Sequence, residues 1–307
     1  MRRPPRPIGL MLGKRLWLSA FVALLCGCGS APRAEQPFRM AIITSENAAD
    51  TATRYQPLAR FLEKKLGRPV EYREASDYAA VVEAMAAKQL ELAYFGAASY
   101  VKAWQITGGN VEPLLTVVDN FGNIGYHSAM IVRADSPYRK VEDLRGKRFA
   151  YVDPNSTSGC QAPQYYLTRQ GMPPAEFFGA TGFTGSHENS IMAVENGSYD
   201  AATIWWNNDE FNALTRMSKK DMIDPARFRV IWDGPQMPYD AWTIRKDLPA
   251  ELRGQVKAAL MAFQAEDPEG WLAMTDGLVS RLVEVSHDDY QDIIVMLDMN
   301  LKQRREQ

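Results

Sequence analysis

Short apolar runs rich in β-branched residues alternate along the chain with segments whose apolar residues recur every three or four positions. The first part of this pattern predicts strands at 38–44, 70–76 and 90–96. Between these strands, residues 55–67 place Leu58, Phe61 and Leu62 on one helical face, and residues 78–89 form a second helical pattern. Strands that alternate with helices in this way are typical of a parallel sheet covered by helices.

The same alternation starts again in the middle of the chain. Strand-like runs lie at 126–133, 148–153, 199–205 and 228–233, and helical patterns lie at about 161–170 and 188–196. From Trp242 onward we expect helices to the end of the chain, with Tyr290, Ile293 and Leu297 on one face. Two α/β units in one chain predict a bilobed protein whose ligand lies where the carboxyl ends of the strands face a shared cleft.

The N-terminal residues have the composition of a targeting segment. A basic start is followed by the mostly apolar residues 16–27, a run too short to span a bilayer but suited to a signal-peptide core. The run ends in "LCGC", which resembles a bacterial lipoprotein cleavage box with Cys28 as the acylated residue. The alternative is an ordinary signal peptide cut near Ala34. We therefore expect a signal peptide at 1–27 and a polar tether at 28–37.

Charge and cysteine content exclude two classes of protein. Residues 1–27 hold five of the 35 basic residues and none of the 37 acidic ones, so the remainder has a net charge of −7. Such a balance argues against nucleic acid as a partner, because backbone phosphates are met by a basic face. Only Cys160 remains in the folded part, so an internal disulfide framework is also excluded.

The stretch "VDPNSTSGCQAP" carries the strongest chemical signal. It places Ser156, Thr157 and Ser158 between a strand and a helix, where the first backbone N–H groups have no intrahelical partner and the helix dipole is positive. Three hydroxyl groups at such a point suit a tetrahedral oxyanion, which needs several hydrogen-bond donors. The alternative is a plain helix N-cap, for which one serine would be enough.

This loop closely resembles the phosphate-binding loop of phosphonate-binding periplasmic proteins, the substrate-binding components of phosphonate ABC importers. Further segments resemble the same family in the same order, including "YQPLARFLEKKLG", "LAYFGAASYV", "SHENSIMAVENGSYDAAT" and "VIWDGPQMPYDAWTIRKDLP". The resemblance covers about residues 38–250. It implies a type II periplasmic-binding-protein fold, with two α/β lobes joined by a two-strand hinge. Lobe one would comprise 38–128 plus 242–307, and lobe two would comprise 129–241.

The resemblance also implies which residues contact the ligand. The phosphonate group would be bound by Ser156, Thr157, Ser158, His187 and Tyr55. The ligand tail would be bound by Tyr94, Phe95, Trp205, Trp206, Asn207 and Asp240. Asn207 stands where a family carboxylate is expected, so one of two amine-binding acids is missing unless Asp209 or Glu210 replaces it. Trp205 and Trp206 either attract a cationic tail through their rings or pack into the core.

The sequence as a whole is interpreted as a periplasmic substrate-binding lipoprotein, anchored through Cys28, that delivers its ligand to an ABC permease in the inner membrane. Asp240 favours a ligand with a cationic tail, such as 2-aminoethylphosphonate or a methylated relative. The alternatives are a phosphite- or phosphate-binding protein and a sensor that presents its ligand to a membrane signalling protein. We expect no catalysis, because Cys160 and His187 lack an adjacent motif. We also expect no cofactor and no metal, because the histidines are scattered.

Overall fold

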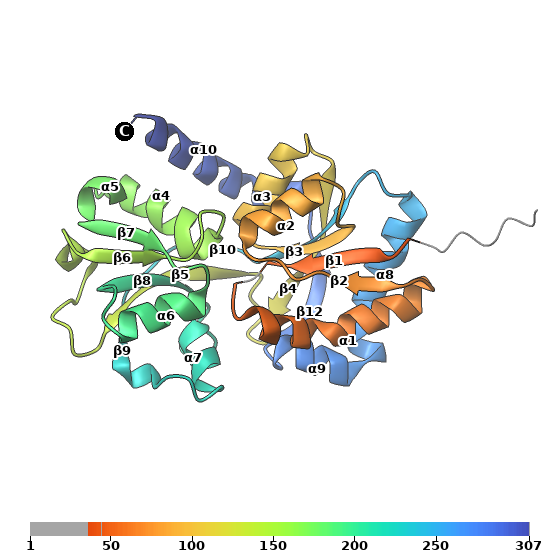
Figure 1. Cartoon of the computed structure of the whole chain (residues 1–307), viewed down its shortest axis with the longest axis horizontal. Helices are drawn as coiled ribbons and strands as arrows, with labels where there is room; N and C mark the ends of the chain where they lie inside the picture. The colour runs from red at the N-terminus through yellow and green to blue at the C-terminus, as the bar shows by residue number, and fades with distance from the viewer. Residues whose placement is uncertain (1–35, 44, 307) are drawn as a thin grey trace, which may run out of the picture. The chain divides into compact units, whose positions relative to one another are not determined.

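Two six-stranded sheets carry the fold of residues 36–43 and 45–306, the part of the chain that the computed structural model describes (Figure 1). The strand order of the first sheet is β12-β4-β11-β3-β1-β2. Its strands are β1 (Phe38–Ile42), β2 (Val70–Tyr72), β3 (Leu92–Phe95), β4 (Val111–Asp119), β11 (Ala241–Arg245) and β12 (Val279–Glu284). The strand β1 pairs in parallel with β2 and β3, whereas β11 is antiparallel to both β3 and β4.

Five helices cover the two faces of this sheet. They are α1 (Ala48–Leu66), α2 (Tyr78–Ala86), α3 (Ala97–Ile106), α8 (Ala250–Glu266) and α9 (Pro268–Thr275). Leu58 and Leu62 of α1 share a buried cluster with Trp242 and Phe263, as their helical spacing predicts. The helix α1 begins at Ala48, well before the predicted start, because the side chain of the capping residue Asn47 accepts a hydrogen bond from the amide of Asp50.

The second sheet has the strand order β10-β5-β8-β6-β7, with β9 paired to β5. Its strands are β5 (Gly125–Arg133), β6 (Arg148–Tyr151), β7 (Ala180–Phe183), β8 (Ala201–Trp206), β9 (Phe228–Asp233) and β10 (Met237–Pro238). Its helices are α4 (Ala162–Arg169), α5 (Pro174–Phe177), α6 (His187–Glu195) and α7 (Ala213–Ser218), with short turns η1 (Val141–Leu144) and η3 (Pro225–Arg227). In Figure 1, α4 and α5 lie on one side of this sheet, and α6 and α7 lie on the other.

The chain passes between the two sheets through two short crossings. The first crossing is the turn between β4 and β5, residues 120–124, and the second consists of Tyr239 and Asp240 between β10 and β11. We refer to the part of the chain around the first sheet as the first lobe, and to the part around the second sheet as the second lobe. Two adjacent crossings of this kind form a hinge about which lobes can move.

The expectation of helices alone after Trp242 is wrong in two places. The strand β11 begins at Ala241 and lies between β3 and β4, where its five residues are all buried, and β12 forms the edge of the same sheet. The tryptophan, threonine and isoleucine of β11 are residues that favour strands, and they fit a fully buried position in a sheet. The 3₁₀ turn η4 (His287–Tyr290) follows β12 and leads into the last helix, α10 (Gln291–Glu306).

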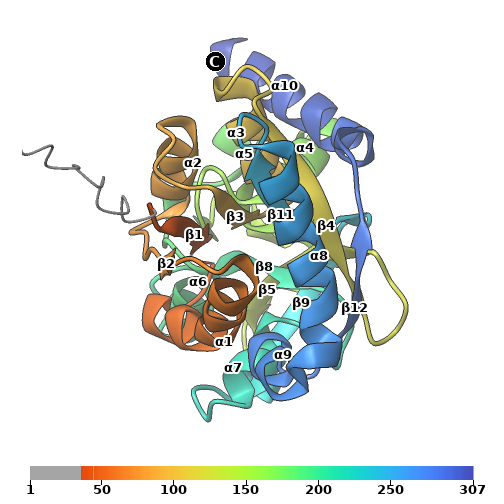
Figure 2. The same ribbon diagram turned by 90° about the vertical axis from the view of Figure 1, so that its right-hand side faces the viewer.

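The helix α10 contacts elements of both lobes, α3 of the first and α4 of the second. Figures 1 and 2 both show it along one rim of the molecule, away from α1, α7 and α9. Among residues 36–43 and 45–306, no helix has the length and apolar character needed to cross a membrane. The predicted signal peptide and Cys28 lie outside the described residues.

Gly159 allows the loop after β6 to pack against the strand that precedes it. A Cβ atom at this position would lie 2.4 Å from the Cβ atom of Val152 and 2.8 Å from Ser156 Oγ. We expect Gly159→Ala to lower the free energy of unfolding by about 1–3 kcal/mol, because the loop must move to relieve the overlap. Chemical denaturation of the purified protein measures this change.

Gly254→Ala is the matched control for this substitution. Gly254 lies inside α8, and a Cβ atom there would meet nothing within 4 Å. We expect this variant to be about 0.5–1 kcal/mol more stable than the wild type, because alanine is the better helix former. A Gly159→Ala variant as stable as the wild type would show that the loop is not constrained by Val152.

Candidate ligand-binding site

A cavity of about 160 Å³ lies between the two lobes and is lined by residues of both. The first lobe contributes Ser45, Glu46, Arg54, Tyr55, Tyr94, Gly96, Asp119 and Trp242. The second lobe and the second crossing contribute Tyr126, Ser156, Thr157, Ser158, His187, Trp205, Asn207, Arg216, Tyr239 and Asp240. The cavity therefore lies where the sequence places a ligand, at the ends of strands that face the other lobe.

The structure brings all the predicted contact residues to this cavity except Phe95 and Trp206. Successive side chains of a strand point to opposite faces, so only one residue of each aromatic pair can face the ligand. In β3, Tyr94 lines the cavity, and Phe95 is fully buried in the core on the other side. In β8, Trp205 lines the cavity and Trp206 does not, and both tryptophans pack against the apolar cluster that contains Ile204.

The predicted anion-binding loop begins the π-helical turn η2 (Thr157–Gln161), which leads directly into α4. Ser156 Oγ accepts a hydrogen bond from the Gly159 amide at 3.0 Å, so this serine does cap the turn. Thr157 Oγ1 accepts a hydrogen bond from the Ala98 amide of the first lobe at 2.9 Å. Ser156 therefore caps this turn, and the Thr157 hydroxyl accepts a hydrogen bond from the first turn of α3 in the other lobe.

The loop presents hydrogen-bond donors without formal charge. The side chains of Ser156, Thr157 and Ser158 line the cavity, although each residue is at most 2% exposed. As the first residues of a helical turn, Thr157 and Ser158 also have backbone N–H groups without an intrahelical acceptor. The phenol groups of Tyr78 and Tyr126 lie beside these hydroxyls, and both tyrosines line the cavity. This arrangement can bind an oxyanion through several neutral donors.

His187 is the first residue of α6 and lies beside the same cavity. Its backbone N–H donates a hydrogen bond to the carbonyl oxygen of Ser45 at 3.0 Å, across the gap between the lobes. Its Nδ1 atom has no hydrogen-bond partner among the described residues, although the side chain is almost fully buried. Burial lowers the pKa of His187 to about 4, against the opposing effect of Glu46. At neutral pH the imidazole is therefore neutral and can donate one hydrogen bond.

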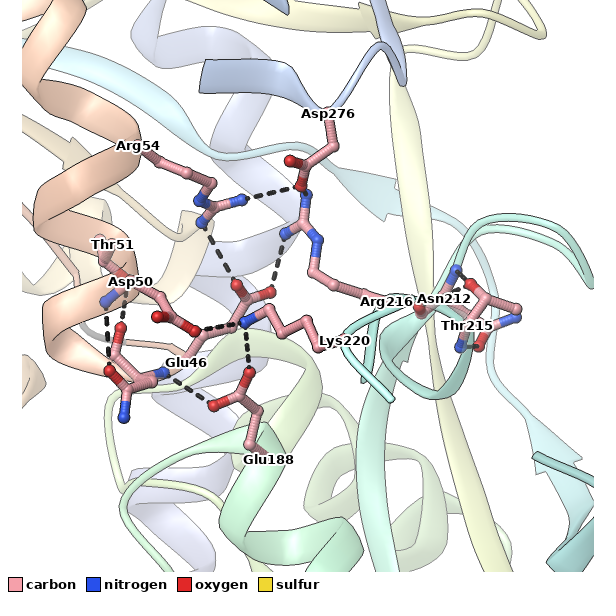
Figure 3. Close-up of polar contacts among 11 residues, drawn as sticks. Glu46, Asp50, Thr51, Arg54, Glu188, Asn212, Thr215, Arg216, Lys220 and Asp276 are labelled. Carbon is pink, nitrogen blue, oxygen red and sulfur yellow. Dashed lines mark hydrogen bonds and ion pairs between the residues drawn. The ribbon is translucent and has the colours of Figure 1, made fainter. Parts of the chain in front are cut away.

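The cavity also contains charged residues that the sequence did not reveal as site residues (Figure 3). Arg216 contacts Glu46 at 2.7 Å and Asp276 at 2.8 Å, and Arg54 contacts Glu46 at 3.2 Å. Burial alone would raise the pKa of Glu46, but the charges of Arg216 and Arg54 lower it to about 2. Both guanidinium groups therefore form ion pairs with carboxylates of the protein. These residues are far apart in the sequence and share no local motif, so the sequence did not indicate the cluster.

Asn207 makes its hydrogen bonds to the hinge. Its amide nitrogen contacts the hydroxyl oxygen of Tyr239 and lies 3.5 Å from Asp119 Oδ2. The Asp119 carboxylate also accepts hydrogen bonds from the Tyr239 hydroxyl at 3.1 Å and from the amides of Phe121 and Asn123 at 2.9 and 2.8 Å. Asp119 therefore joins the two crossings to the end of β8.

A second carboxylate does lie at this end of the cavity, but it is not one of the predicted substitutes. Asp209 and Glu210 are exposed and do not line the cavity. Asp119 is 1% exposed, lines the cavity, and is already bonded to hinge residues. Its position at the end of β4, far from the other site segments in the sequence, explains why motif comparison did not find it.

Asp240 is an acid in the cavity that lacks a cationic partner. None of the ion pairs formed by the described residues includes it, and burial raises its pKa to about 6. A Cβ atom added to Gly96 would lie 3.6 Å from Asp240 Oδ1 and 3.3 Å from Thr157 Oγ1, so the carboxylate is close to the anion-binding loop. Tyr126 and Tyr239 stack in parallel at 5.5 Å nearby, and both line the cavity. This part of the site is acidic and aromatic.

Comparison with known proteins gives a consistent family assignment. Residues 40–290 match the family model described as "ABC transporter, phosphonate, periplasmic substrate-binding protein". The chain is 31% identical to the phosphate-import protein PhnD of Mycolicibacterium smegmatis, over 91% of this chain and 92% of that protein. It is 32% identical to the phosphonates-binding periplasmic protein of Escherichia coli, over 76% of this chain and 68% of that protein.

Solved structures agree with this assignment. A binding protein of a phosphonate ABC transporter from Pseudomonas aeruginosa superposes with a TM-score of 0.77 at 25% identity, covering 87% of each chain. PhnD1 from Prochlorococcus marinus, solved in complex with methylphosphonate, has the same fold, with a TM-score of 0.72 at 21% identity over 84% of this chain and 96% of that one. The chain thus belongs to the family of periplasmic substrate-binding proteins of phosphonate ABC transporters.

Proposed function

We propose that this protein binds an aminoalkylphosphonate, with 2-aminoethylphosphonate as the representative ligand, and delivers it to an ABC permease in the inner membrane. The observation that carries this proposal is the pairing of an uncharged anion-binding loop with Asp240, an acid that has no cationic partner among the described residues. A zwitterionic ligand with an oxyanion at one end and an ammonium group at the other satisfies both.

The phosphonate group would be bound by the loop and by His187. The hydroxyls of Thr157 and Ser158, the free backbone amides of the turn and the neutral imidazole all line or border the cavity. Hydrogen bonds to a charged group contribute about 1.5–3 kcal/mol each. Micromolar affinity corresponds to about 8 kcal/mol. A handful of such donors is therefore enough, even after the entropy lost on association.

The ammonium group would lie beside Asp240 and the tyrosine rings. The ammonium group would serve as the counter-ion of the buried Asp240 carboxylate. The faces of Tyr94, Tyr126 and Tyr239, which line the cavity, would add cation–π attraction. The ring of Trp205 is already 5.4 Å from the guanidinium of Arg216, so it contributes little to a further cation. The site therefore favours a primary ammonium paired with a carboxylate over a methylated one enclosed by rings.

Phosphate or phosphite is the nearest chemical alternative, and the relative named as a phosphate-import protein covers almost the whole chain. The carboxylates of Asp240 and Asp119 argue against it, because neither has a basic partner and both line the cavity. A small anion without a cationic tail leaves Asp240 unpaired and adds a second negative charge beside it.

Catalysis is not part of the proposal. Cys160 is fully buried, and burial raises the pKa of its thiol to about 12, so no thiolate nucleophile is available near neutral pH. The related proteins are named as importers or binding proteins. Anchoring through Cys28 remains part of the proposal, and mass spectrometry of the protein purified from a bacterial membrane would show the acyl chains on this residue.

Calorimetric titration with a ligand panel tests the proposed function. We expect 2-aminoethylphosphonate to bind at least ~10-fold more tightly than methylphosphonate, because only the former pairs with Asp240, and a tenfold difference requires only about 1.4 kcal/mol. The N-trimethyl derivative, phosphite and phosphate complete the panel. Tighter binding of phosphate or phosphite than of any aminoalkylphosphonate would contradict the proposal and support the phosphate alternative.

Asp240→Asn tests the assigned role of the carboxylate. We expect the affinity for 2-aminoethylphosphonate to fall ~10- to 100-fold, the loss typical of removing one partner of a buried charge pair. The affinity for methylphosphonate should stay within a few-fold of the wild-type value, because that ligand has no ammonium group. Equal losses for both ligands would show that Asp240 acts only by supporting the structure.

The same variant tests the electrostatic cost of the empty site. Burial favours the neutral form of Asp240 and raises its pKa to about 6. The stability that the neutral form contributes is fully present below the pKa of the unfolded state, and it is lost as the pH rises through about 6. Asp240→Asn should therefore stabilise the ligand-free protein by about 1–3 kcal/mol at pH 7.5 and by much less at pH 4. Thermal unfolding at the two pH values measures this difference. Identical melting temperatures at pH 7.5 would mean that the carboxylate carries no desolvation cost.

A further inference from the structure

At one edge of the cavity, charged side chains from the two lobes form ion pairs with one another (Figure 3), and two of them, Glu46 and Arg216, line the cavity. Glu46, Asp50 and Asp276 belong to the first lobe, and Arg216 and Lys220 belong to the second. Arg216 contacts Glu46 at 2.7 Å and Asp276 at 2.8 Å, and Lys220 contacts Asp50 at 2.8 Å. We call these five residues the ionic rim. Each of its three ion pairs spans the gap between the lobes.

Two hydrogen bonds strengthen the same rim. The backbone N–H of His187 donates to the carbonyl oxygen of Ser45, and the backbone N–H of Asn47 donates to Glu188 Oε2, both at 3.0 Å. Glu188 also pairs with Lys220 at 2.8 Å, which fixes the position of the lysine. The loop between β1 and α1 is thus bound directly to the start of α6, which carries a proposed ligand contact.

The opposite rim has a different chemistry. Here α10 lies along both lobes, and Asn300 Nδ2 donates to the backbone oxygen and to Oε1 of Gln161, each at 2.8 Å. Ile293 and Met296 of α10 share a buried apolar cluster with Ala162 of the second lobe. These contacts are neutral or apolar, and Figures 1 and 2 place α10 on the rim away from α1, α7 and α9.

The two rims differ in the free energy that is needed to separate the lobes there. Opening the α10 rim exposes buried apolar surface to water, and this exposure opposes separation. Opening the ionic rim returns charged groups to water, which largely offsets the loss of the ion pairs. The ionic rim is therefore the easier one to open. It also bears unlike charges on the two lobes, which attract each other again on closure.

We propose that the ionic rim is a closing latch and that Arg216 and Lys220 are positioning residues for ligand binding. The lobes separate at this rim while the α10 rim stays in contact, so the ligand enters between the residues of the latch. Latch residues act on the fraction of closed protein and not on the ligand itself. Weakening the latch therefore lowers the affinity for every ligand by the same factor, because binding requires the closed arrangement.

This inference rests on the proposed function only in that the ligand binds between the lobes. Two readouts separate the two proposals. Calorimetry reports the affinity, and small-angle X-ray scattering of the ligand-free protein reports how far apart the lobes are. If no phosphonate binds to the wild type, the proposed function fails, and scattering still tests the latch.

The experiment compares Arg216→Gln and Lys220→Gln with Arg227→Gln. Arg227 forms an exposed ion pair with Glu195 at 2.6 Å inside the second lobe, so its loss removes an ion pair of similar type that does not span the gap. Lys220→Gln is included because the Lys220 side chain is 30% exposed, against 15% for Arg216, and because Arg216→Gln leaves the buried Glu46 with one cation fewer and risks misfolding.

We expect Lys220→Gln to weaken the binding of 2-aminoethylphosphonate and methylphosphonate by the same factor, ~3- to 10-fold, and Arg216→Gln to weaken both further. The radius of gyration of the ligand-free variants should exceed that of the wild type. Raising the salt concentration should have the same effect on the wild type, because it screens the exposed parts of the latch. The control Arg227→Gln should match the wild type in both measurements.

The proposal is overturned if Lys220→Gln and Arg227→Gln give the same affinities and the same radius of gyration. It is also overturned if the latch variants weaken one ligand and leave the other unchanged, because such selectivity would mean direct contact with the ligand.

Discussion

A buried carboxylate is either stabilised in its charged form by a cation or has its pKa raised by burial, and the cavity of this protein contains both situations. At one end, Glu46 is held between Arg54 and Arg216 and stays ionised. At the other end, Asp240 has no cationic partner among the residues that the structure describes, and its pKa is raised by burial. The two arginines are paired with the protein's own acids, and we therefore propose that the uncharged loop binds the oxyanion. The proposed preference for a ligand with a cationic tail rests on Asp240.

The hinge and the site share residues, which links ligand binding to lobe closure. Asp119 ends β4 and accepts hydrogen bonds from the turn of the first crossing and from Tyr239 of the second. Asp240, which follows Tyr239 in the chain, lines the cavity. On the other side of the cavity, Thr157 of the loop accepts a hydrogen bond from the Ala98 amide in the opposite lobe. The proposed ligand contacts and the interlobe contacts are therefore made by neighbouring residues, and we expect closure of the lobes to complete the proposed site.

The local parts of this structure were predictable from the sequence, and the long-range parts were not. Periodicity indicated the alternating strands and helices, and the three consecutive hydroxyls before a glycine do line the cavity, where their binding of an anion stays a prediction. Strand alternation alone could have shown that Phe95 and Trp206 face away from the cavity once Tyr94 and Trp205 face it. The strands β11 and β12 were missed because both lie in the segment from Trp242 onward that was interpreted as helical throughout.

Contacts between distant residues left no trace in the sequence pattern. Glu46, Arg216 and Asp276 come from three separate segments, and only the folded chain brings them together at the cavity. The same holds for Asp119, whose position in the hinge depends on pairing with Tyr239. A carboxylate that stabilises a turn and one that binds a ligand look alike in a sequence. Their roles differ because their partners differ in the folded structure.

The most direct measurement of the central claim is a crystal structure with 2-aminoethylphosphonate bound. The account predicts that the phosphonate oxygens lie within hydrogen-bond distance, ~2.7–3.2 Å, of the hydroxyl and amide groups at Thr157 and Ser158, with the ammonium group beside Asp240. In that structure the ion pairs of Glu46 with Arg54 and Arg216 remain intact. A phosphonate group bound instead by the two arginines, with Glu46 displaced from them, would contradict the account.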